Sequence, residues 1–293
     1  MENFKSGFVV ITGKPNVGKS TLMNLILKEK LSIVSPKPQT TRQSVKGIYN
    51  DENKQIIFLD TPGFLEPKYL LQEKMLNYLK TSLKDADVIL FITDAKTFPT
   101  DYDKNLLETL KKINKPKIAI INKIDLISQG ELVQKTQLLS PYGFNEIIPA
   151  SFITYFDTEK FLQTLADYLP ENPPYYDTET ISDQGMKFFV QEIIREKIFL
   201  NFSQEIPYST TVTVEEYKEY DNKVEIKANI WIERQSQKPI IIGKNGEMIK
   251  KIRVESEKEI HAILAKRVKL QLWVKIKKNW RKKNNALKEF GYK

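Results

Sequence analysis

An eight-residue segment near the N-terminus constrains the fold of this chain more than any other feature. Residues 13–20 read GKPNVGKS and fit the pattern G-x-x-x-x-G-K-[ST], between the apolar run Phe8–Thr12 and a helical pattern over Lys19–Lys30. Glycines let such a loop turn its N–H groups toward phosphate oxygens, and the following helix adds its positive N-terminal end. The segment predicts a strand, a phosphate-binding loop and a helix in succession; a Gly-rich turn without a ligand is the alternative.

Two residues of this loop have specific expected roles. Lys19 should bridge the β- and γ-phosphates of a nucleotide, and Ser20 should hold Mg²⁺ through its hydroxyl. The residues predicted to contact nucleotide here are Gly13, Lys14, Pro15, Asn16, Val17, Gly18, Lys19, Ser20 and Thr21.

Short apolar runs recur through the N-terminal half, and helical patterns separate most of them. The runs expected to form buried strands are Phe8–Thr12, Gln55–Asp60, Val88–Asp94, Lys117–Asn122 and Glu146–Ser151. This alternation predicts an α/β domain with a mostly parallel sheet covered on both faces. Val45–Tyr49 and Gln55–Asp60 flank a short polar turn, which predicts a hairpin and one antiparallel edge strand.

A proline-rich stretch, Leu169–Pro174, separates this pattern from a different one. Prolines disfavour helix and favour an extended linker. The pattern beyond it has an α+β order, with expected elements at Gly185–Phe202, Ser209–Glu216 and Val224–Glu233, then two helical stretches and a strand at Val268–Lys277. We therefore predict a domain at 1–170, a linker at 171–178 and a second domain at 179–293.

Composition excludes several classes of site. The sequence has no cysteine and one histidine, His261, which rules out disulfides, thiolate or histidine-ligated metal clusters and a Ser-His-Asp triad. No run approaches the about 20 apolar residues that a membrane span needs, and the N-terminus has no signal-peptide pattern. These observations favour a cytoplasmic protein.

A second motif, Asp60-Thr61-Pro62-Gly63, follows the apolar run that ends at Asp60. Ligands of α/β sheets bind at the carboxyl ends of the strands, so this carboxylate should lie beside the phosphate loop. Asp60 can then bind Mg²⁺ and the Gly63 amide can contact a γ-phosphate, with Phe64 next in the chain. Taken alone, the motif could be only a turn.

A third motif, Asn122-Lys123-Ile124-Asp125, indicates the base. A carboxylate at Asp125 can accept hydrogen bonds from N1–H and the exocyclic amine of guanine, a donor pair that adenine lacks. Alone, these four residues could be a helix N-cap, and an ATPase is the alternative enzyme. Because the three motifs occur in fixed order, each after an apolar run, they together predict a guanine-nucleotide site.

These motifs resemble those of the P-loop GTPase superfamily, and over its whole length the chain resembles the Era family. The resemblance implies GTP or GDP with Mg²⁺ as ligands, and switch segments at 36–47 and 60–71. It implies a first switch at Gln39, Thr40, Thr41 and Arg42, in which Thr41 ligates Mg²⁺ when GTP is bound. Mg²⁺ is then held by Ser20, Thr41 and Asp60.

The chain departs from the family pattern at two positions. Ala150-Ser151-Phe152 matches the last nucleotide motif, whose backbone touches the guanine oxygen, but the family usually has Ser-Ala there with a glycine soon after. Phe64 stands where Ras-like GTPases carry a water-orienting glutamine, which predicts slow intrinsic hydrolysis. In related GTPases with such a replacement the residue equivalent to Asn16 binds K⁺, so K⁺ is an expected further cofactor. The expected catalytic residues are Lys19, Asn16 and Thr41.

The second domain contains a Gly-x-x-Gly loop, Gly243–Gly246, flanked by apolar residues at helical spacing. With the α-β-β-α-α-β order, it resembles a type II KH domain, in which this loop clamps the backbone of single-stranded RNA. A plain loop between helices is the alternative. The residues expected to bind RNA are Ile242, Gly243, Lys244, Asn245, Gly246, Lys250 and Lys251.

Positive charge is concentrated at the C-terminal end. Residues 238–293 hold 17 Lys and Arg against 5 Asp and Glu, an excess of +12, so the other 237 residues sum to −3 of the total +9. Such segregation indicates a polyanionic partner, either nucleic acid or an acidic membrane surface. Trp273 is expected to pack in the core, and Trp280 to belong to a basic C-terminal tail.

The resemblance to Era implies a monomeric GTP-hydrolysing switch that binds the 3′ end of small-subunit ribosomal RNA and acts on the 30S-type particle during assembly. It also leaves open peripheral contact with the inner face of the cell membrane. The rival interpretation is a nucleotide-insensitive RNA-binding or membrane-surface protein with a vestigial GTP site. Intact Lys19, Ser20, Asp60, Asn122 and Asp125 argue against it.

Overall fold

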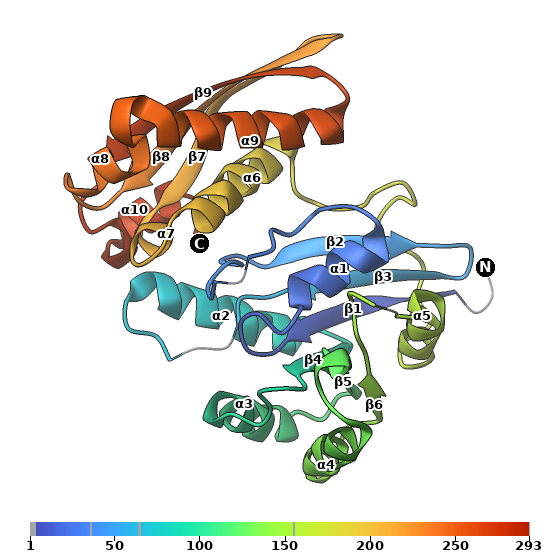
Figure 1. The fold of residues 1–293 in the computed structure, drawn as a ribbon. Helices are drawn as coiled ribbons and strands as arrows, with labels where there is room; N and C mark the ends of the chain where they lie inside the picture. The colour runs from blue at the N-terminus through green and yellow to red at the C-terminus, as the bar shows by residue number, and fades with distance from the viewer. Residues whose placement is uncertain (1–3, 36, 64–65, 155, 293) are drawn as a thin grey trace. The chain divides into compact units, whose positions relative to one another are not determined.

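The computed structural model describes residues 4–35, 37–63, 66–154 and 156–292. The chain forms two compact units (Figure 1). The first comprises residues up to Pro67 and Met75–Asp183, and the second comprises Lys68–Lys74 and the chain from Gln184 onward.

The first unit is built on a sheet with the order β2-β3-β1-β4-β5-β6. Neighbouring strands run parallel except β2, which is antiparallel to β3 at the edge (Figure 1). The strands are β1 Lys5–Thr12, β2 Val45–Asn50, β3 Lys54–Asp60, β4 Val88–Asp94, β5 Lys117–Asn122 and β6 Glu146–Pro149. The predicted α/β class with one antiparallel edge strand is confirmed.

Helices cover both faces of this sheet. They are α1 Lys19–Leu27, α2 Leu70–Asp85, α3 Asp101–Lys111, α4 Gln129–Leu139 and α5 Thr158–Asp167. Side chains that alternate along the strands, such as Val10, Ile57 and Phe91, share a core with α2, α3 and α4. Val9 and Ile11 point the other way because strand side chains alternate, and they too are fully buried.

Local sequence explains where several of these helices begin. Thr100 and Asp103 form a capping box at the start of α3, and Ser128 and Glu131 form another at α4. Asp157 caps α5 by accepting a hydrogen bond from the Lys160 N–H. Each cap satisfies a backbone donor that the helix leaves unpaired, which stabilises it by about 1 kcal/mol.

The segment after α5 stays attached to the first unit along β2 and β3. The side chain of Gln55 accepts from the N–H of Tyr176 and donates to its carbonyl oxygen, at 3.0 and 2.8 Å. Ile48 N–H donates to the Ile181 oxygen at 2.9 Å. The predicted boundaries at 1–170, 171–178 and 179–293 stay a prediction, to which the structure adds that the segment up to Asp183 lies with the first unit.

The second unit has the sheet order β7-β8-β9, with β7 and β8 antiparallel and β8 and β9 parallel. Its elements are α6 Met186–Asn201, α7 Ile206–Ser209, β7 Thr211–Glu219, β8 Lys223–Ile232, α8 Gln237–Ile242, α9 Glu247–Leu264, β9 Arg267–Ile276 and α10 Asn284–Glu289. Helices α6 and α9 pack on one face of the sheet around Ile194, Ile230 and Ile252. The α+β order predicted for this part is confirmed.

The two tryptophans near the C-terminus exchange their expected positions. Trp273 is 42% exposed, whereas Trp280 is fully buried and donates its indole N–H to the Ser209 oxygen at 2.9 Å. The expectation of a core Trp273 was therefore wrong. Strand side chains alternate in β9, so Leu270 and Val274 take the buried face and Trp273 takes the open one.

Within the described ranges, no helix is both long and apolar enough to cross a membrane.

Candidate nucleotide site and nucleic-acid interface

The phosphate loop joins β1 to α1 through backbone conformations that favour glycine. Gly13 and Gly18 have φ of 145° and 109°, and Asn16 has φ of 65°. A Cβ atom on Gly13 would lie 2.1 Å from the Ile92 oxygen, and one on Gly18 would lie 2.5 Å from Asn122 Nδ2. Gly18 also precedes α1 without a side-chain cap, so the start of this helix faces the cavity as an anion site requires.

Lys19 lies at the start of α1 with its ammonium group buried. Its Nζ donates to the Gly13 and Lys14 oxygens at 3.1 and 2.8 Å. Burial lowers the pKa of Lys19 to about 8, and the nearby Asp60 carboxylate only partly offsets this effect. A phosphate group beside Lys19 would therefore supply the negative charge that a buried ammonium lacks.

The side-chain oxygens of Ser20, Thr41 and Asp60 converge although they come from separate parts of the sequence. Ser20 Oγ donates to Asp60 Oδ2 at 2.7 Å, Thr41 Oγ1 donates to the same oxygen at 3.3 Å, and the two hydroxyls are 3.2 Å apart. Burial raises the pKa of Asp60 although the charge of Lys19 opposes the shift. Asp60 Oδ1 is buried and accepts no hydrogen bond from the described residues.

This oxygen set fits Mg²⁺, which prefers one or two carboxylates, hydroxyls, water and substrate phosphates. A buried carboxylate oxygen without a partner is the feature expected where a cation binds. In the described part of the chain, no group of three or more His, Cys, Asp or Glu side chains could hold a metal ion. The predicted ligand set does not conflict with this, because it has only one carboxylate.

The motif that follows β3 lies against the phosphate loop. Thr61 Oγ1 donates to the Ile11 oxygen of β1 at 2.8 Å, which fixes the turn, and Thr61 and Pro62 are buried. A Cβ on Gly63 would lie 3.1 Å from Pro15 Cδ. The Gly63 main chain therefore lies beside the phosphate loop, whereas the predicted site residue Phe64 lies outside the described residues.

The motif after β5 is tied to the phosphate loop by direct hydrogen bonds. Asn122 Nδ2 donates to the Val17 oxygen at 2.8 Å, and Lys123 Nζ donates to the Asn16 oxygen at 3.0 Å. Lys123 also forms a 2.6 Å ion pair with Asp94 at the end of β4. These contacts place the base-recognition and phosphate-binding loops in one rigid site.

The loop after β6 holds the carboxylate that is expected to choose the base. Ser151 is buried and its Oγ donates to Asp125 Oδ1 at 2.5 Å. Ile124 N–H donates to the Ala150 oxygen at 3.2 Å. Asp125 is exposed, so it can accept from a guanine edge while Ser151 fixes its orientation.

These loops enclose an open cavity of about 450 Å³. Its lining includes most of the predicted residues, namely Pro15, Asn16, Gly18, Lys19, Ser20, Thr21, Gln39, Thr40, Thr41, Gly63, Asn122, Lys123 and Phe152. The predicted residues that lie outside this lining are Gly13, Lys14, Val17, Asp60, Thr61, Pro62, Ile124, Asp125, Ala150 and Ser151.

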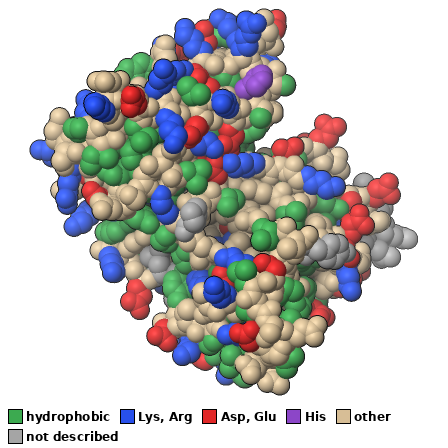
Figure 2. All heavy atoms as spheres, viewed as in Figure 1, with side chains coloured by type: hydrophobic (Ala, Val, Ile, Leu, Met, Phe, Trp, Pro, Cys, Tyr) green, Lys and Arg blue, Asp and Glu red, His purple; other side chains and the backbone are tan. Residues whose placement is uncertain are grey.

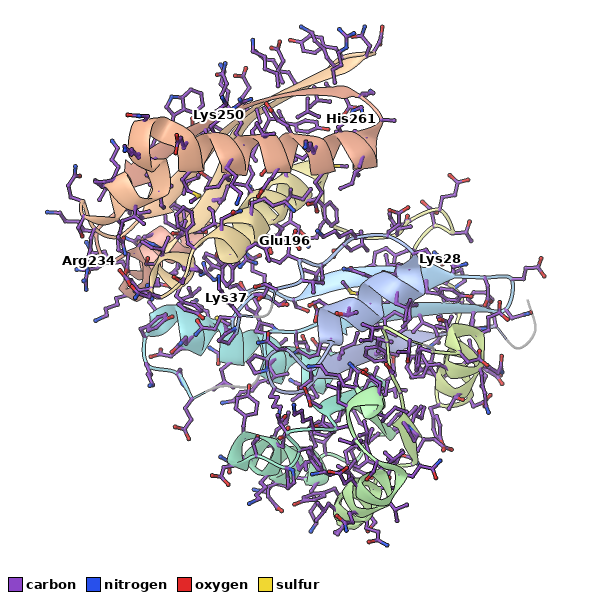
Figure 3. All side chains as sticks on the ribbon, in the orientation of Figure 1. Lys28, Lys37, Glu196, Arg234, Lys250 and His261 are labelled. Carbon is purple, nitrogen blue, oxygen red and sulfur yellow. The ribbon has the colours of Figure 1, made fainter. Side chains whose placement is uncertain are left out.

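The first switch reaches the cavity from the loop between α1 and β2. Gln39 has φ of 61°, and Thr40 Oγ1 donates to the Lys37 oxygen at 2.7 Å. Arg42 is buried, whereas Lys37, labelled in Figure 3, lies in the same loop and lines the cavity. The structure thus brings Thr41 to the metal-site oxygens.

Sequence reasoning missed several residues around the site. Thr97 and Asp103 were not predicted. Thr97 Oγ1 accepts from Lys14 Nζ at 2.6 Å and Asp103 lies 3.4 Å from the same atom, so the side chain of Lys14, predicted to contact nucleotide, braces the loop from outside. Asp94 holds Lys123 from the end of β4, and its position at a parallel strand's carboxyl end could have revealed it. The apolar lining from Ile33 and Val34 carried no motif.

The Gly-x-x-Gly loop of the second unit joins α8 to α9. Gly243 and Gly246 have φ of 76° and 79°, and Asn245 has φ of 52°. Ile241 is buried and anchors the loop, whereas Lys244, Asn245, Lys250 and Lys251 are exposed and Ile242 is half-buried. Lys250 is labelled on α9 in Figure 3, and Figure 2 shows Lys and Arg side chains recurring over this unit.

This arrangement suits a phosphate backbone. Glycine allows close approach of a strand to the main chain, the N-terminus of α9 offers N–H groups, and the exposed lysines add charge.

Comparison with known proteins finds a matching family model for each half of the chain. A family model for a 50S ribosome-binding GTPase matches residues 8–123, and a KH domain model matches residues 205–281. The chain is 44% identical over 293 residues to GTPase Era of Geotalea daltonii, and the alignment covers 99% of each. The chain belongs to the Era family of GTPases. It is likewise 44% identical over 292 residues to GTPase Era of Clostridium perfringens, again with 99% of each covered.

Solved Era structures share the fold over the full length. An Era variant from Aquifex aeolicus bound to GDP and AlF4⁻ matches with a TM-score of 0.94, 39% identity and 99% of each chain covered. Era in complex with MgGDPNP and nucleotides 1506–1542 of 16S ribosomal RNA matches with the same TM-score, 40% identity and the same coverage. The predicted family, the fold class and GTP hydrolysis as the activity are confirmed.

Proposed function

We propose that this chain is a GTP-hydrolysing switch that binds the 3′ end of small-subunit ribosomal RNA and assists maturation of the small ribosomal subunit. The observation that carries the proposal is a single cavity with a buried lysine at one end and a guanine motif at the other. The same chain presents a glycine loop beside exposed lysines, and an Era structure binds 16S ribosomal RNA. We place this activity in the cytoplasm and assign it to the monomer.

The phosphate end of the cavity binds the nucleotide tail. Lys19 exchanges its carbonyl partners for phosphate oxygens, and the backbone N–H groups between Gly13 and Ser20 surround the β-phosphate. The oxygens of Ser20, Thr41 and Asp60 would hold Mg²⁺. When bound, Mg²⁺ neutralises charge that develops on the β- and γ-phosphate oxygens.

Hydrolysis breaks the bond between the γ-phosphorus and the bridging oxygen to the β-phosphate, as a water oxygen attacks from the opposite side. Lys19 stabilises the charge on the leaving GDP, and the Gly63 amide faces the transferred group. We expect slow turnover because Phe64, and not a water-orienting glutamine, follows Gly63 in the sequence.

We propose that K⁺ stimulates hydrolysis and that the Asn16 side chain at the phosphate loop helps to hold this ion. Asn16 lines the cavity in a left-handed conformation that only Asn, Asp and glycine adopt readily. Single-turnover hydrolysis is expected to be faster in KCl than in NaCl at equal ionic strength, and equal rates would reject this assignment.

Base choice comes from the other end of the cavity. Asp125 accepts hydrogen bonds from N1–H and the exocyclic amine of guanine, with Ser151 holding the carboxylate in place. Adenine would leave this charged group unpaired, which costs about 1–3 kcal/mol or more. GTP is therefore bound in preference to ATP.

The switch is carried by the segment that contains Thr41. With GTP bound, Thr41 would help to hold Mg²⁺, and hydrolysis would release the segment. Strand β2 begins four residues later, and its Lys46 pairs with Asp183 at 2.9 Å while the Lys46 oxygen accepts from Ser182 at 2.6 Å. Because Asp183 directly precedes the second unit in the chain, these contacts support a route from nucleotide to RNA binding.

The test is footprinting of the full chain on small-subunit particles with a GTP analogue, with GDP and without nucleotide. Protection of the 3′ end of the ribosomal RNA is expected to depend on the nucleotide. Equal protection in all states would remove the switch, and preferential binding to anionic vesicles over RNA would favour the membrane-surface alternative.

A further inference from the structure

The aromatic side chain at position 152 lies in the nucleotide cavity. Phe152 is half-buried and lines the cavity with Gly18, Asn122 and Lys123. A Cβ on Gly18 would lie 3.0 and 3.2 Å from Cδ2 and Cε2 of Phe152, so the ring lies directly against the phosphate-loop main chain.

The ring is held firmly from behind. Its centroid lies 5.1 Å from that of Phe156 in an edge-on arrangement, and Phe156 lies 5.1 Å from Phe161, a buried residue of α5. The Phe152 N–H donates to Asn122 Oδ1 at 3.2 Å. Both the ring and its backbone are therefore positioned before any ligand binds, which lowers the entropy cost of a contact.

The ring lies at the base end of the cavity. The Phe152 N–H donates to Asn122 of the base motif, and Lys123 of the same motif lines the cavity, as do Lys19 and Ser20 of the phosphate loop. Ile153 and Val34 line the same cavity although 80% and 42% of their surfaces are exposed. Large exposed apolar side chains around a cavity indicate that a ligand with an apolar surface covers them.

We propose that the Phe152 side chain packs against the guanine base and acts as a specificity-determining residue for nucleotide binding, in addition to the backbone contact expected at this motif. The inference rests on the proposed function of the same site. An aromatic side chain stacks on any base and does not by itself select one. Here Asp125 binds the edge of the guanine while Phe152 packs on its face. The two residues together favour guanine nucleotides over a bare polyphosphate.

The experiment displaces a fluorescent GDP analogue from the full chain with GDP or with inorganic tripolyphosphate, which has no base. Phe152→Ala is expected to weaken GDP binding about tenfold and to leave tripolyphosphate binding unchanged. Phe152→Leu, which keeps bulk in the cavity, is expected to lose about threefold for GDP. Phe188→Ala changes a half-buried ring of α6 in the second unit and should alter neither affinity.

The outcomes separate the possible roles. GDP binding by Phe152→Ala that equals or exceeds the wild-type affinity would overturn the inference. Equal losses for GDP and tripolyphosphate would also overturn it, because the ring would then only brace Gly18. If Phe152→Ala fails to fold in a thermal melt, Phe152→Leu decides by the same comparison. Absence of GDP binding by the wild-type chain would instead reject the proposed function itself.

Discussion

The phosphate loop and the Gly-x-x-Gly loop use the same backbone device for different purposes. In each, a glycine with positive φ directly precedes a helix without a side-chain cap, Gly18 before α1 and Gly246 before α9. A Cβ on Gly18 would collide with Asn122 and Phe152, whereas one on Gly246 would meet no described atom within 4 Å. The first loop is enclosed by other loops and shaped for one ligand; the second is open and can accept a chain.

The lysines of the two loops differ in burial, as the loops themselves do. Lys19 is buried, and burial lowers its pKa to about 8, whereas Lys244, Lys250 and Lys251 are exposed. A buried charge interacts strongly with its ligand because little water screens it, and an exposed charge is weakened by salt. One substitution in the phosphate loop should therefore remove most of the affinity for nucleotide, whereas each substitution in the Gly-x-x-Gly loop should lower the affinity for RNA only in part.

The largest expected effect is at Lys19. Lys19→Ala removes charge-assisted hydrogen bonds to the β- and γ-phosphates and should weaken GTP binding by about 4 kcal/mol, about 1000-fold. Calorimetric titration with Mg²⁺ and GTP measures this. RNA affinity without nucleotide serves as the control and should not change; a loss below tenfold for GTP would contradict the role given to Lys19.

A smaller loss is expected when the base contact is altered. Asp125→Asn places an N–H group opposite the guanine donors and should lower GDP affinity about 100-fold. The new amide could still accept from Ser151 and donate to the C2 oxygen of xanthine. Xanthosine diphosphate should therefore bind the variant better than GDP does. Unchanged GDP affinity would show that Asp125 does not choose the base.

In the open loop the introduction of a negative charge should have a more moderate effect. Gly246→Asp introduces a carboxylate where phosphate is expected and should weaken binding to a pyrimidine-containing single-stranded RNA about tenfold. Gly246→Ala, which adds only backbone strain, is the matched control, and GDP affinity should be unchanged in both. Equal RNA affinity in Gly246→Asp and wild type would remove this loop from the RNA site.

Single exposed lysines should matter less. Lys244→Ala is expected to reduce RNA affinity about threefold and to lower the slope of log affinity against log salt by about 0.7, the value for one phosphate contact on a single strand. Filter binding at KCl concentrations from about 50 to about 300 mM measures this slope. A slope identical to that of the wild type would mean that Lys244 contacts no phosphate.

The smallest expected effect is the uptake of protons when nucleotide binds. Because the pKa of Lys19 is lowered to about 8, the unliganded site loses its charge above that pH, and phosphate binding restores it. Nucleotide binding should thus take up about half a proton at pH 8 and little at pH 6.5. The same shift makes the folded, unliganded chain gain stability as pH rises from about 8 toward 10.5. Calorimetry in buffers of different ionisation enthalpy measures the uptake, and none at pH 8 would contradict it.

The enclosed loops were the most predictable part of the molecule from sequence. Each chemical motif follows a buried strand, so the parallel arrangement of β1, β3 and β5 brings Gly13, Asp60 and Asn122 to one edge. The residues that escaped prediction are the acidic partners of Lys123 and Lys14 and the apolar lining from Ile33 and Val34. Asp94 and Asp103 act through distant partners that no local spacing announces.

Helices outside the motifs were harder to predict. Helix α2 was not predicted by its residues, although Leu71, Met75, Leu79 and Leu83 recur every four residues and are buried, a signal that the sequence did contain. Helix α4 buries fully only Leu139 and exposes Val133 and Leu138, so its periodicity is weak. Its clearest local signal is the capping box of Ser128 and Glu131, which the sequence contained.

The most direct test of the account is calorimetric titration of the purified full chain with GTP, GDP and ATP in the presence of Mg²⁺. One molecule of GTP or GDP should bind per chain, and ATP should bind about tenfold more weakly or worse under the same conditions. No heat with either guanine nucleotide, or equal affinity for ATP, would contradict it.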